Sequence, residues 1–138
     1  MNDGLKFSKI KNVEKKTAKL ISTGNVVGWF QGRGEIGHRA LGNRSILADP
    51  RKINAKELVN QRLKKRDWFM PYAPAVLEED MKFFTNKDYF SAYMQVAFNV
   101  NNSIKNKIRS TIHIDNTARI QTVSKKTNYK FWKLLKEF

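Results

Sequence analysis

A glycine- and arginine-rich stretch, from Gly32 to Arg51, places the strongest constraint on how this chain folds. It holds four glycines and four arginines in twenty residues. Glycine accepts positive φ angles and lets backbone N–H groups approach a ligand without interference from a Cβ atom. Arginine supplies a planar guanidinium that binds two oxygens of a phosphate or carboxylate at once. The stretch therefore predicts a loop that cradles an anion such as a phosphate or carboxyphosphate.

Apolar residues on both sides of this loop predict that it is held in a fixed position. The run from Val26 to Phe30 predicts a buried strand over residues 25–31, and Ile46 to Ala48 form a second apolar segment. Composition alone leaves open that the glycines mark ordinary turns and the arginines a solvated face. The side chains expected to face the anion are those of Arg33, Arg39, Asn43, Arg44 and Ser45.

The loop also spells a dinucleotide-binding motif, but its surroundings do not fit that motif. Gly32, Gly34 and Gly37 follow a predicted strand with the spacing GxGxxG. A dinucleotide site needs this motif to open a long helix. Gly42 and Pro50 come too soon to allow one, so the spelling is interpreted as accidental.

Length and composition predict one domain over residues 1–138 with a hydrophobic core of its own. The chain has no cysteine and two histidines, so no disulfide is expected and no metal-binding residues are assigned. No apolar run reaches eighteen residues and the amino end lacks the apolar core of a signal peptide. We therefore expect a cytoplasmic protein with no membrane segment.

A net charge of +15 favours anionic partners. Nucleotides and phosphorylated metabolites fit this charge, and so does nucleic acid. Basic residues interleave with aromatic ones around Trp68, Phe69 and Tyr72, as in many nucleic-acid-binding surfaces. A basic nucleic-acid-binding module therefore remains an alternative.

Apolar spacing predicts helices and strands along the rest of the chain. Val13, Thr17, Leu20 and Ile21 predict a helical face that Gly24 ends. Further helices are predicted over residues 55–63, from Glu78 through residue 84, and over residues 129–138 with Tyr129, Trp132 and residues 135–138 as the apolar stripe. Alternation predicts strands over residues 94–100 and 108–115, and a second strand-like run through residues 119–121.

His113 and Asp115 are the second group of candidate site residues. On a strand they would lie side by side, because residues two apart point to the same face. Thr117 follows in a predicted turn, and Arg119 comes shortly after it. A single histidine on a strand is more often structural than functional, but the adjacent acid and arginine favour a site.

Three segments together resemble the carboxy-terminal domain of the O-carbamoyltransferases, a family with nodulation and antibiotic-tailoring members. They are GWFQGRGEIGHRALGNRSILADPR, KKRDWFMPYAPAVLEE and HIDNTARIQTV, and the resemblance runs from about Val13 to the end of the chain. It implies a YrdC-like fold, which is an α/β twisted open mixed sheet with flanking helices. The family continues beyond the last helix seen in this chain, so the resemblance also implies a fold that is incomplete at its carboxy end.

The resemblance implies a domain that binds ATP and carbamoyl phosphate and forms carbamoyl adenylate for O-carbamoylation of a hydroxyl. It implies catalytic roles for Arg39, Lys64 and Arg119, with Mg²⁺ expected beside the triphosphate. The acceptor step would belong to a companion chain or domain with an actin-like fold, which alone would bind iron. The substrate-binding residues would be Arg33, Asn43, Arg44, Ser45, His113, Asp115 and Thr117.

The chain departs from the family pattern at three positions. Met70 stands where the family usually has the arginine of FRPFAP, Gly34 where it favours methionine, and His38 where it favours proline. Loss of an arginine at residue 70 removes one expected phosphate contact. A catalytically degenerate remnant that keeps the fold is therefore a further alternative.

Overall fold

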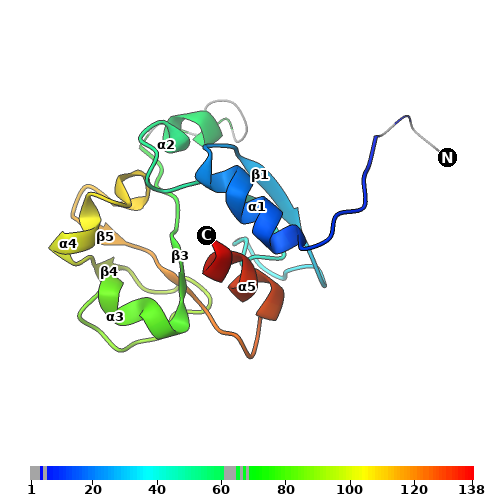
Figure 1. Cartoon of the computed structure of the whole chain (residues 1–138). Helices are drawn as coiled ribbons and strands as arrows, with labels where there is room; N and C mark the ends of the chain where they lie inside the picture. The colour runs from blue at the N-terminus through cyan, green and yellow to red at the C-terminus, as the bar shows by residue number, and fades with distance from the viewer. Residues whose placement is uncertain (1–3, 5, 61–64, 66, 68) are drawn as a thin grey trace.

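The computed structural model describes residue 4, residues 6–60, residues 65 and 67, and residues 69–138. Strands and short helices alternate along these segments, which confirms the predicted α/β class (Figure 1). The elements are α1 (Val13–Ser22), β1 (Val27–Phe30), β2 (Arg44–Leu47), α2 (Ala55–Glu57), β3 (Ala75–Leu77), the 3₁₀ helix η2 (Glu78–Asp80), α3 (Met81–Phe84), β4 (Phe98–Asn99), α4 (Asn102–Lys105), the 3₁₀ helix η3 (Arg109–Thr111), β5 (Thr117–Ala118), β6 (Gln121–Val123) and α5 (Tyr129–Glu137).

The strands of the described segments form three two-stranded sheets rather than one open sheet. β1 and β2 pair antiparallel, with Val27 opposite Leu47. β4 and β5 also pair antiparallel, whereas β3 and β6 pair parallel with Val76 opposite Thr122. Parallel and antiparallel pairs therefore both occur, but no sheet of the described segments contains both, unlike the single mixed sheet that was predicted.

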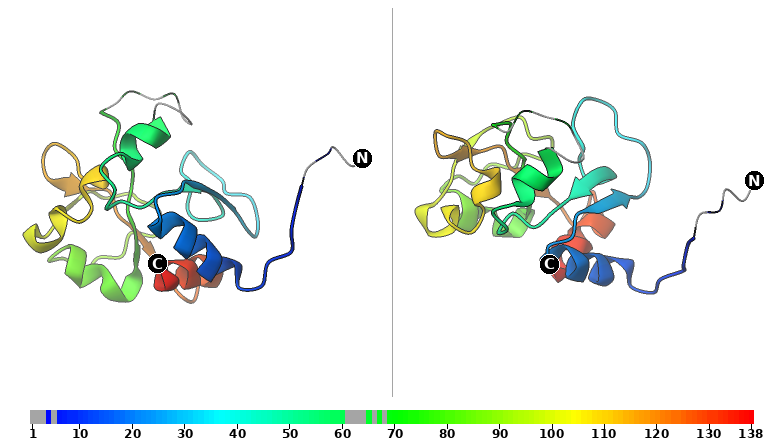
Figure 2. Two further views of the ribbon diagram at one scale, coloured as in Figure 1. Left: turned by 45° about the horizontal axis from the view of Figure 1, so that its top comes forward. Right: turned by 90° about the horizontal axis from the view of Figure 1, so that it is seen from above.

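Two hydrophobic clusters hold the elements together. The first contains Val76, Met81, Phe98 and Ile120, and the second contains Ile21, Trp29, Val123, Phe131 and Leu134. Figures 1 and 2 show the elements of the first cluster on one side of β3 and those of the second, with α1 beside α5, on the other. The chain from β5 to β6 joins both clusters, because Ile120 and Val123 belong to different ones.

The first helix ends where the sequence predicts. Gly24 has a φ angle of +95°, its N–H donates to Ile21, and the next N–H, of Asn25, donates to Leu20. These two bonds satisfy carbonyls at the helix end that would otherwise lack partners. The buried face is Thr17, Ala18 and Ile21. Leu20 and Val13, which were predicted to lie on the buried face, are exposed.

Two predicted strands were largely wrong. Within residues 94–100 only Phe98–Asn99 form a strand, because Met94 has a φ angle of +55°, which extended backbone cannot adopt. Residues 108–115 form η3 and a turn in place of a strand, and the Asn116 N–H closes the turn on the His113 carbonyl at 3.0 Å. The apolar residues alternate there without pairing with a neighbouring strand.

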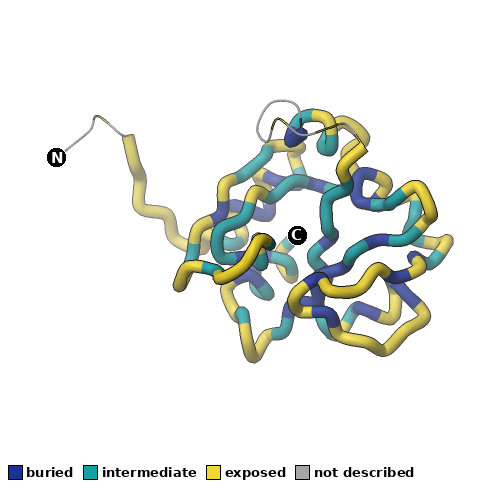
Figure 3. The backbone as a smooth tube through the Cα atoms, turned by 180° about the vertical axis from the view of Figure 1, so that it is seen from behind, coloured by how far each residue is buried: buried dark blue, intermediate teal, exposed yellow. Residues whose placement is uncertain are grey.

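Two other elements differ from prediction in the face that they bury. In β1 only Trp29 is buried, and Phe30 is 75% exposed, so this strand is not the fully buried one predicted. In α5 the buried residues are Phe131 and Leu134, whereas Tyr129 is exposed. Figure 3 shows buried residues interspersed with exposed ones along much of the chain, and shows the exposed amino-terminal arm.

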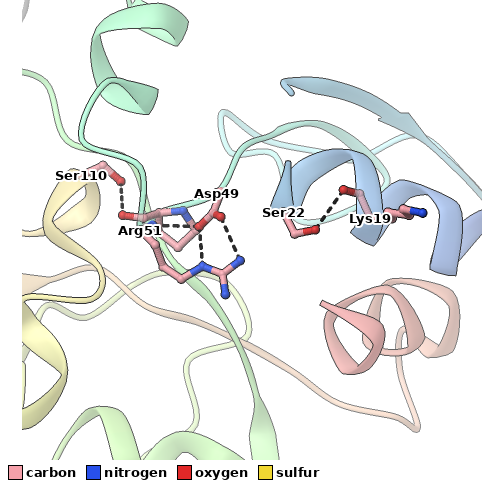
Figure 4. A network of polar contacts seen from close by, with 6 residues as sticks. Lys19, Ser22, Asp49, Arg51 and Ser110 are labelled. Carbon is pink, nitrogen blue, oxygen red and sulfur yellow. Dashed lines mark hydrogen bonds and ion pairs between the residues drawn. The ribbon is translucent and has the colours of Figure 1, made fainter. Parts of the chain in front are cut away.

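An apolar groove of about 380 Å³ runs between the two clusters, and a polar clip lies at its edge. The buried carboxylate of Asp49 accepts hydrogen bonds from Nε and Nη2 of Arg51, both at 2.8 Å (Figure 4). Ser110 donates to the Pro50 carbonyl at 2.9 Å across sixty residues of sequence. The Arg51 guanidinium also covers the Phe138 ring at 4.5 Å. The clip therefore ties the exit of β2 to η3 and to the end of α5.

The carboxylate of Asp49 is held in its ionised form. Burial by itself would raise the pKa of Asp49, but hydrogen bonds from the Arg51 side chain and backbone and the Arg51 charge act more strongly together. The pKa of Asp49 therefore lies below its ordinary value. A lowered pKa in the folded state adds stability above the ordinary aspartate pKa of about 4, and this stability is lost as the pH falls through the folded pKa.

We predict that Asp49→Asn lowers the free energy of unfolding by about 1–2 kcal/mol at neutral pH, because a half-exposed Arg51 then loses its charged partner. The variant should also lose less stability than the wild type between about pH 5 and pH 3. Urea unfolding at several pH values measures both effects. Asp88→Asn, at an exposed position, is the matched control, and equal pH dependence in all three proteins would contradict the assignment.

Candidate functional site

The loop that joins β1 to β2, residues 32–43, is called the glycine–arginine loop here. The Gln31 N–H donates to the Asn43 carbonyl at 2.9 Å and closes the base of the loop. Residues 31–43 are all described and form no helix. This confirms that the GxGxxG spelling does not open a dinucleotide site.

The carboxylate of Glu35 organises this loop from within. It accepts hydrogen bonds from the backbone N–H groups of Leu41 at 2.7 Å, Asn43 at 3.0 Å and Arg44 at 3.2 Å. The Ser45 hydroxyl accepts the Gly42 N–H at 2.9 Å. Four backbone donors that the sequence suggested for a ligand are thus used by the chain itself. These four N–H groups are therefore not available to a bound anion.

Side-chain amides fasten the loop to α5. Gln31 Nε2 donates to Oδ1 of Asn43 at 3.0 Å and to Oδ1 of Asn128 at 2.6 Å. Asn128 also accepts the Phe131 N–H, so it caps α5 and holds the loop at once. Asn43 Nδ2 in turn donates to the Arg33 carbonyl at 3.2 Å. Sequence analysis missed Gln31 and Asn128, because isolated amides carry no periodic signal.

Gly42 lets the loop touch the core. Its φ angle is +102°, and a Cβ atom there would lie 2.7 Å from Cγ of the buried Phe131. Both the backbone conformation and the contact therefore require glycine. The loop is packed on the second cluster rather than projecting from it.

The arginines in the loop and at its end divide into two kinds. Arg44 donates from Nη1 to the carbonyls of Gln31 at 2.6 Å and Asn43 at 3.0 Å, and from Nη2 to Gly32 at 3.2 Å. Its guanidinium lies 3.4 Å from the centre of the Phe30 ring. Arg44 thus braces the loop.

Arg39 and Arg33 remain available to a ligand. Arg39 is half-buried and makes no hydrogen bond or ion pair with another described residue, and Arg33 is exposed. Lys64, which was predicted to be catalytic together with Arg39 and Arg119, lies outside the described residues. Arg39 is therefore the loop cation best placed to bind an anion.

The end of the segment from Thr117 to Gln121 contacts this loop. Ala118 and Ile120 are fully buried in the first cluster. Gln121 Nε2 donates to the Leu41 carbonyl at 2.8 Å. Arg119 stands two residues before Gln121, and Arg39 two residues before Leu41. The hydrogen bond thus brings together two chain segments that each carry a predicted site arginine.

A hydrogen-bonded group lies at the start of the segment from Thr117 to Gln121. It consists of His113, Asp115 and Thr117. Asp115 Oδ1 accepts the Thr117 hydroxyl at 2.7 Å, and the same hydroxyl oxygen lies 2.9 Å from Nδ1 of His113. Hydrogen bonds from Thr117 lower the pKa of Asp115. The bond from the Thr117 hydroxyl has the larger effect, and the bond from its backbone N–H has the smaller one. A turn brings these residues together, rather than the predicted strand.

We call Thr117, Arg119 and Gln121, together with the glycine–arginine loop and His113, the anion face. Its half-buried arginines suit oxyanions. The described residues hold no group of three histidine, aspartate or glutamate side chains placed to bind a metal. None of the helices in the described segments is long and apolar enough to cross a membrane.

Comparisons with known proteins agree with the motifs. The family described as Carbamoyltransferase C-terminus matches residues 18–138, and this chain belongs to that family. It is 42% identical over 137 residues to nodulation protein NolNO of Sinorhizobium fredii, covering 97% of this chain and 20% of that protein. It is 37% identical over 118 residues to a 3'-hydroxymethylcephem-O-carbamoyltransferase of Amycolatopsis lactamdurans, covering 86% of this chain and 22% of that protein.

An uncharacterized protein of Methanocaldococcus jannaschii is 44% identical over 121 residues, covering 88% of this chain and 20% of that protein. The chain thus spans about a fifth of the length of these relatives. The resemblance drawn from the three motifs is confirmed, and the family is one of transferases.

We predict that Gly42→Ala lowers the free energy of unfolding by about 3 kcal/mol or more, because the methyl group meets Phe131 and the φ angle is strained. Gly34→Ala, with open space and ordinary φ, should cost less than about 1 kcal/mol. Chemical denaturation of both variants measures the difference. Equal stabilities would show that the loop is not packed on α5.

We predict that Glu35→Gln lowers stability by about 1–2 kcal/mol, because a neutral amide oxygen replaces a carboxylate that binds three backbone N–H groups. Hydrogen exchange should accelerate at the amides of Leu41, Asn43 and Arg44. Glu57→Gln, at an exposed position, is the control. Unchanged exchange at all three amides would refute the organising role of Glu35.

Proposed function

We propose that the anion face binds carbamoyl phosphate and ATP and promotes the formation of carbamoyl adenylate. Membership of the carbamoyltransferase family supports this proposal. The observation that carries it is the hydrogen bond from Gln121 to Leu41, which sets the segment of Arg119 against the loop of Arg39. Two guanidinium groups from distant parts of the chain can then act on one polyanionic ligand.

The chemistry requires cations at fixed positions. Water converts carbamoyl phosphate to carbamate and phosphate, a carbamate oxygen then attacks the α-phosphorus of ATP, and pyrophosphate leaves. Each reactant is anionic, so attack is disfavoured unless positive charge offsets the repulsion. Arg39 and Arg119 would supply that charge, with Lys64 as a third cation of the proposal. Mg²⁺ would accompany the triphosphate, and we assign it no ligand among the described residues.

The remaining predicted residues take two kinds of role in this proposal. Arg44, Asn43 and Ser45 would act by shaping the loop, since their side chains bond to its backbone and amides. Arg33, His113, Asp115 and Thr117 would contact the ligand or position a group that does. The YrdC-like topology implied by the resemblance is part of the same proposal.

Transfer to a hydroxyl would take place outside this chain. The chain corresponds to about a fifth of its relatives, so we propose that a companion domain or chain, actin-like and iron-binding, receives the carbamoyl group. The acceptor of this protein would be a hydroxyl compound. Carbamoyl adenylate would be the intermediate passed between the two parts.

We predict that Arg39→Ala and Arg119→Ala each weaken binding of carbamoyl phosphate or ATP at least tenfold, equivalent to about 1.4 kcal/mol or more. Isothermal calorimetry measures binding, and pyrophosphate exchange into ATP that depends on carbamoyl phosphate measures the reaction. Arg109→Ala, an exposed arginine bonded to Asn106, is the matched control.

The outcomes separate this proposal from its rivals. No binding of either ligand, alone or with the companion part, would overturn it. Strongly salt-dependent binding of oligonucleotides, unaffected by Arg39→Ala, would favour a nucleic-acid-binding module instead. Stable folding with binding but no exchange, even with the companion part present, would indicate a catalytically degenerate remnant.

A further inference from the structure

The imidazole of His113 has one nitrogen in a hydrogen-bonded chain and one nitrogen that is buried without a partner. Nδ1 lies 2.9 Å from the Thr117 hydroxyl oxygen, and that oxygen lies 2.7 Å from Oδ1 of Asp115. Nε2 is buried and makes no hydrogen bond with any described residue. A buried nitrogen without a partner is uncommon, because buried polar groups are nearly always hydrogen-bonded.

Counting protons along this chain fixes where the hydrogen on the ring lies. Asp115 is a carboxylate, so it can only accept hydrogen bonds. The Thr117 hydroxyl has one hydrogen, and Asp115 accepts it at 2.7 Å. The Thr117 oxygen must then accept from His113, so Nδ1 carries a hydrogen. In the neutral ring Nε2 is consequently a bare acceptor.

An acceptor at this position is chemically unlike the rest of the anion face. Arg39, Arg119 and Arg33 present only donors, which suit phosphate oxygens. An imidazole nitrogen with a free lone pair repels such oxygens and attracts an N–H group. Nε2 is also shielded from water, so an N–H group that reaches it has little competition from solvent.

The ring is held beside β5 by its bonds to Thr117. Thr117 opens the segment that leads through Arg119 to Gln121, and the Gln121 side chain bonds to the glycine–arginine loop. His113 bonds to the Thr117 side chain and is therefore held at the start of the segment that reaches this loop. Its backbone N–H also donates to the Thr117 carbonyl at 2.8 Å, which holds the turn against the strand.

We propose that His113 Nε2 accepts a hydrogen bond from an NH₂ group of the bound ligand and selects for that group, with Thr117 and Asp115 as positioning residues. This inference rests on the proposed function, because it concerns the ligands of the same face. Carbamoyl phosphate carries such a group on its carbonyl carbon, and ATP carries one on adenine. Both are planar NH₂ donors, so the experiment must distinguish them.

The first measurement tests the hydrogen-bonded chain without any ligand. The ¹⁵N chemical shifts of the ring report which nitrogen carries the hydrogen, and the chain has two histidines, so His38→Phe assigns the spectrum. At a pH where the ring is neutral, we expect His113 to be protonated at Nδ1. Thr117→Val should move the population toward hydrogen on Nε2. A neutral His113 with hydrogen on Nε2 in the wild type would overturn the proposal.

The second measurement compares ligands that differ in one group. Acetyl phosphate replaces the NH₂ group of carbamoyl phosphate with a methyl group, and inosine triphosphate replaces the amine of adenine with a carbonyl. Because an acceptor without a donor is penalised in a buried site, we expect the wild type to prefer one NH₂ ligand over its partner at least tenfold. His113→Phe should abolish that preference, whereas His113→Gln, whose amide oxygen can still accept, should retain part of it.

The outcomes identify the source of the NH₂ group. A preference for carbamoyl over acetyl phosphate that His113→Phe removes assigns the contact to the carbamoyl amide, and the same result with the nucleotide pair assigns it to adenine. Asp88→Asn, at an exposed position outside the anion face, should leave both preferences unchanged. Preferences that do not depend on His113, with binding intact, would overturn this inference alone. Failure of the wild type to bind any of the four ligands would instead overturn the proposed function.

Discussion

The geometry of the anion face depends on the Glu35 carboxylate and the three backbone N–H groups that it binds. The glycine–arginine loop has positive φ angles at Gly32, Gly37 and Gly42, so its backbone cannot pair with itself in a regular way. Its donors need an acceptor, and Glu35 provides two oxygens for them. A carboxylate in this place also offsets part of the positive charge of the neighbouring arginines. Without it, the loop would lose both its hydrogen bonds and its electrostatic balance.

A loop ordered from within can be placed accurately by few contacts to the rest of the molecule. Gln121 holds the Leu41 carbonyl, Asn128 holds Gln31, and Phe131 packs against Gly42. These three residues come from β6 and α5, which meet in the second hydrophobic cluster. The position of the glycine–arginine loop relative to β6 and α5 is therefore determined by the core. Packing and the shape of the loop are coupled through amide side chains.

The sequence predicted those parts of the fold that depend on local patterns. The first helix and its glycine stop, the acidic turn before Met81, and a strand leading into the glycine–arginine loop were all confirmed. The strands predicted over residues 94–100 and 108–115 were largely wrong, because a two-residue alternation of apolar residues also occurs in turns and in a 3₁₀ helix. Burial does not follow the alternation there, since Val96 and Ile114 are exposed. A non-glycine residue in the left-handed conformation, such as Met94, cannot be recognised from amino-acid composition.

The sequence predicted which residue types occur in the candidate site better than it predicted what each residue does there. Arginine, histidine and aspartate were recognised from their chemistry, and the structure brings His113, Asp115 and Thr117 into contact. The organising residues Glu35, Gln31, Gln121 and Asn128 were missed, because each acts on backbone or amide groups that lie far away or at irregular spacing in sequence. Only the placement of a single acid among the glycines and arginines of the loop could have pointed to Glu35.

The charge of the chain and the chemistry of the anion face act over different distances. With 27 basic and 12 acidic residues, attraction of anions is general, and salt screens it beyond about 8 Å at physiological ionic strength. Arg44 contributes little to selectivity, because carbonyl groups already occupy its guanidinium. Arg39 is half-buried and has no hydrogen-bond acceptor among the described residues, so its charge is screened less than that of an exposed arginine. In the proposed function, selectivity would therefore come from a few partly buried groups, and the net charge would raise the rate at which anions arrive.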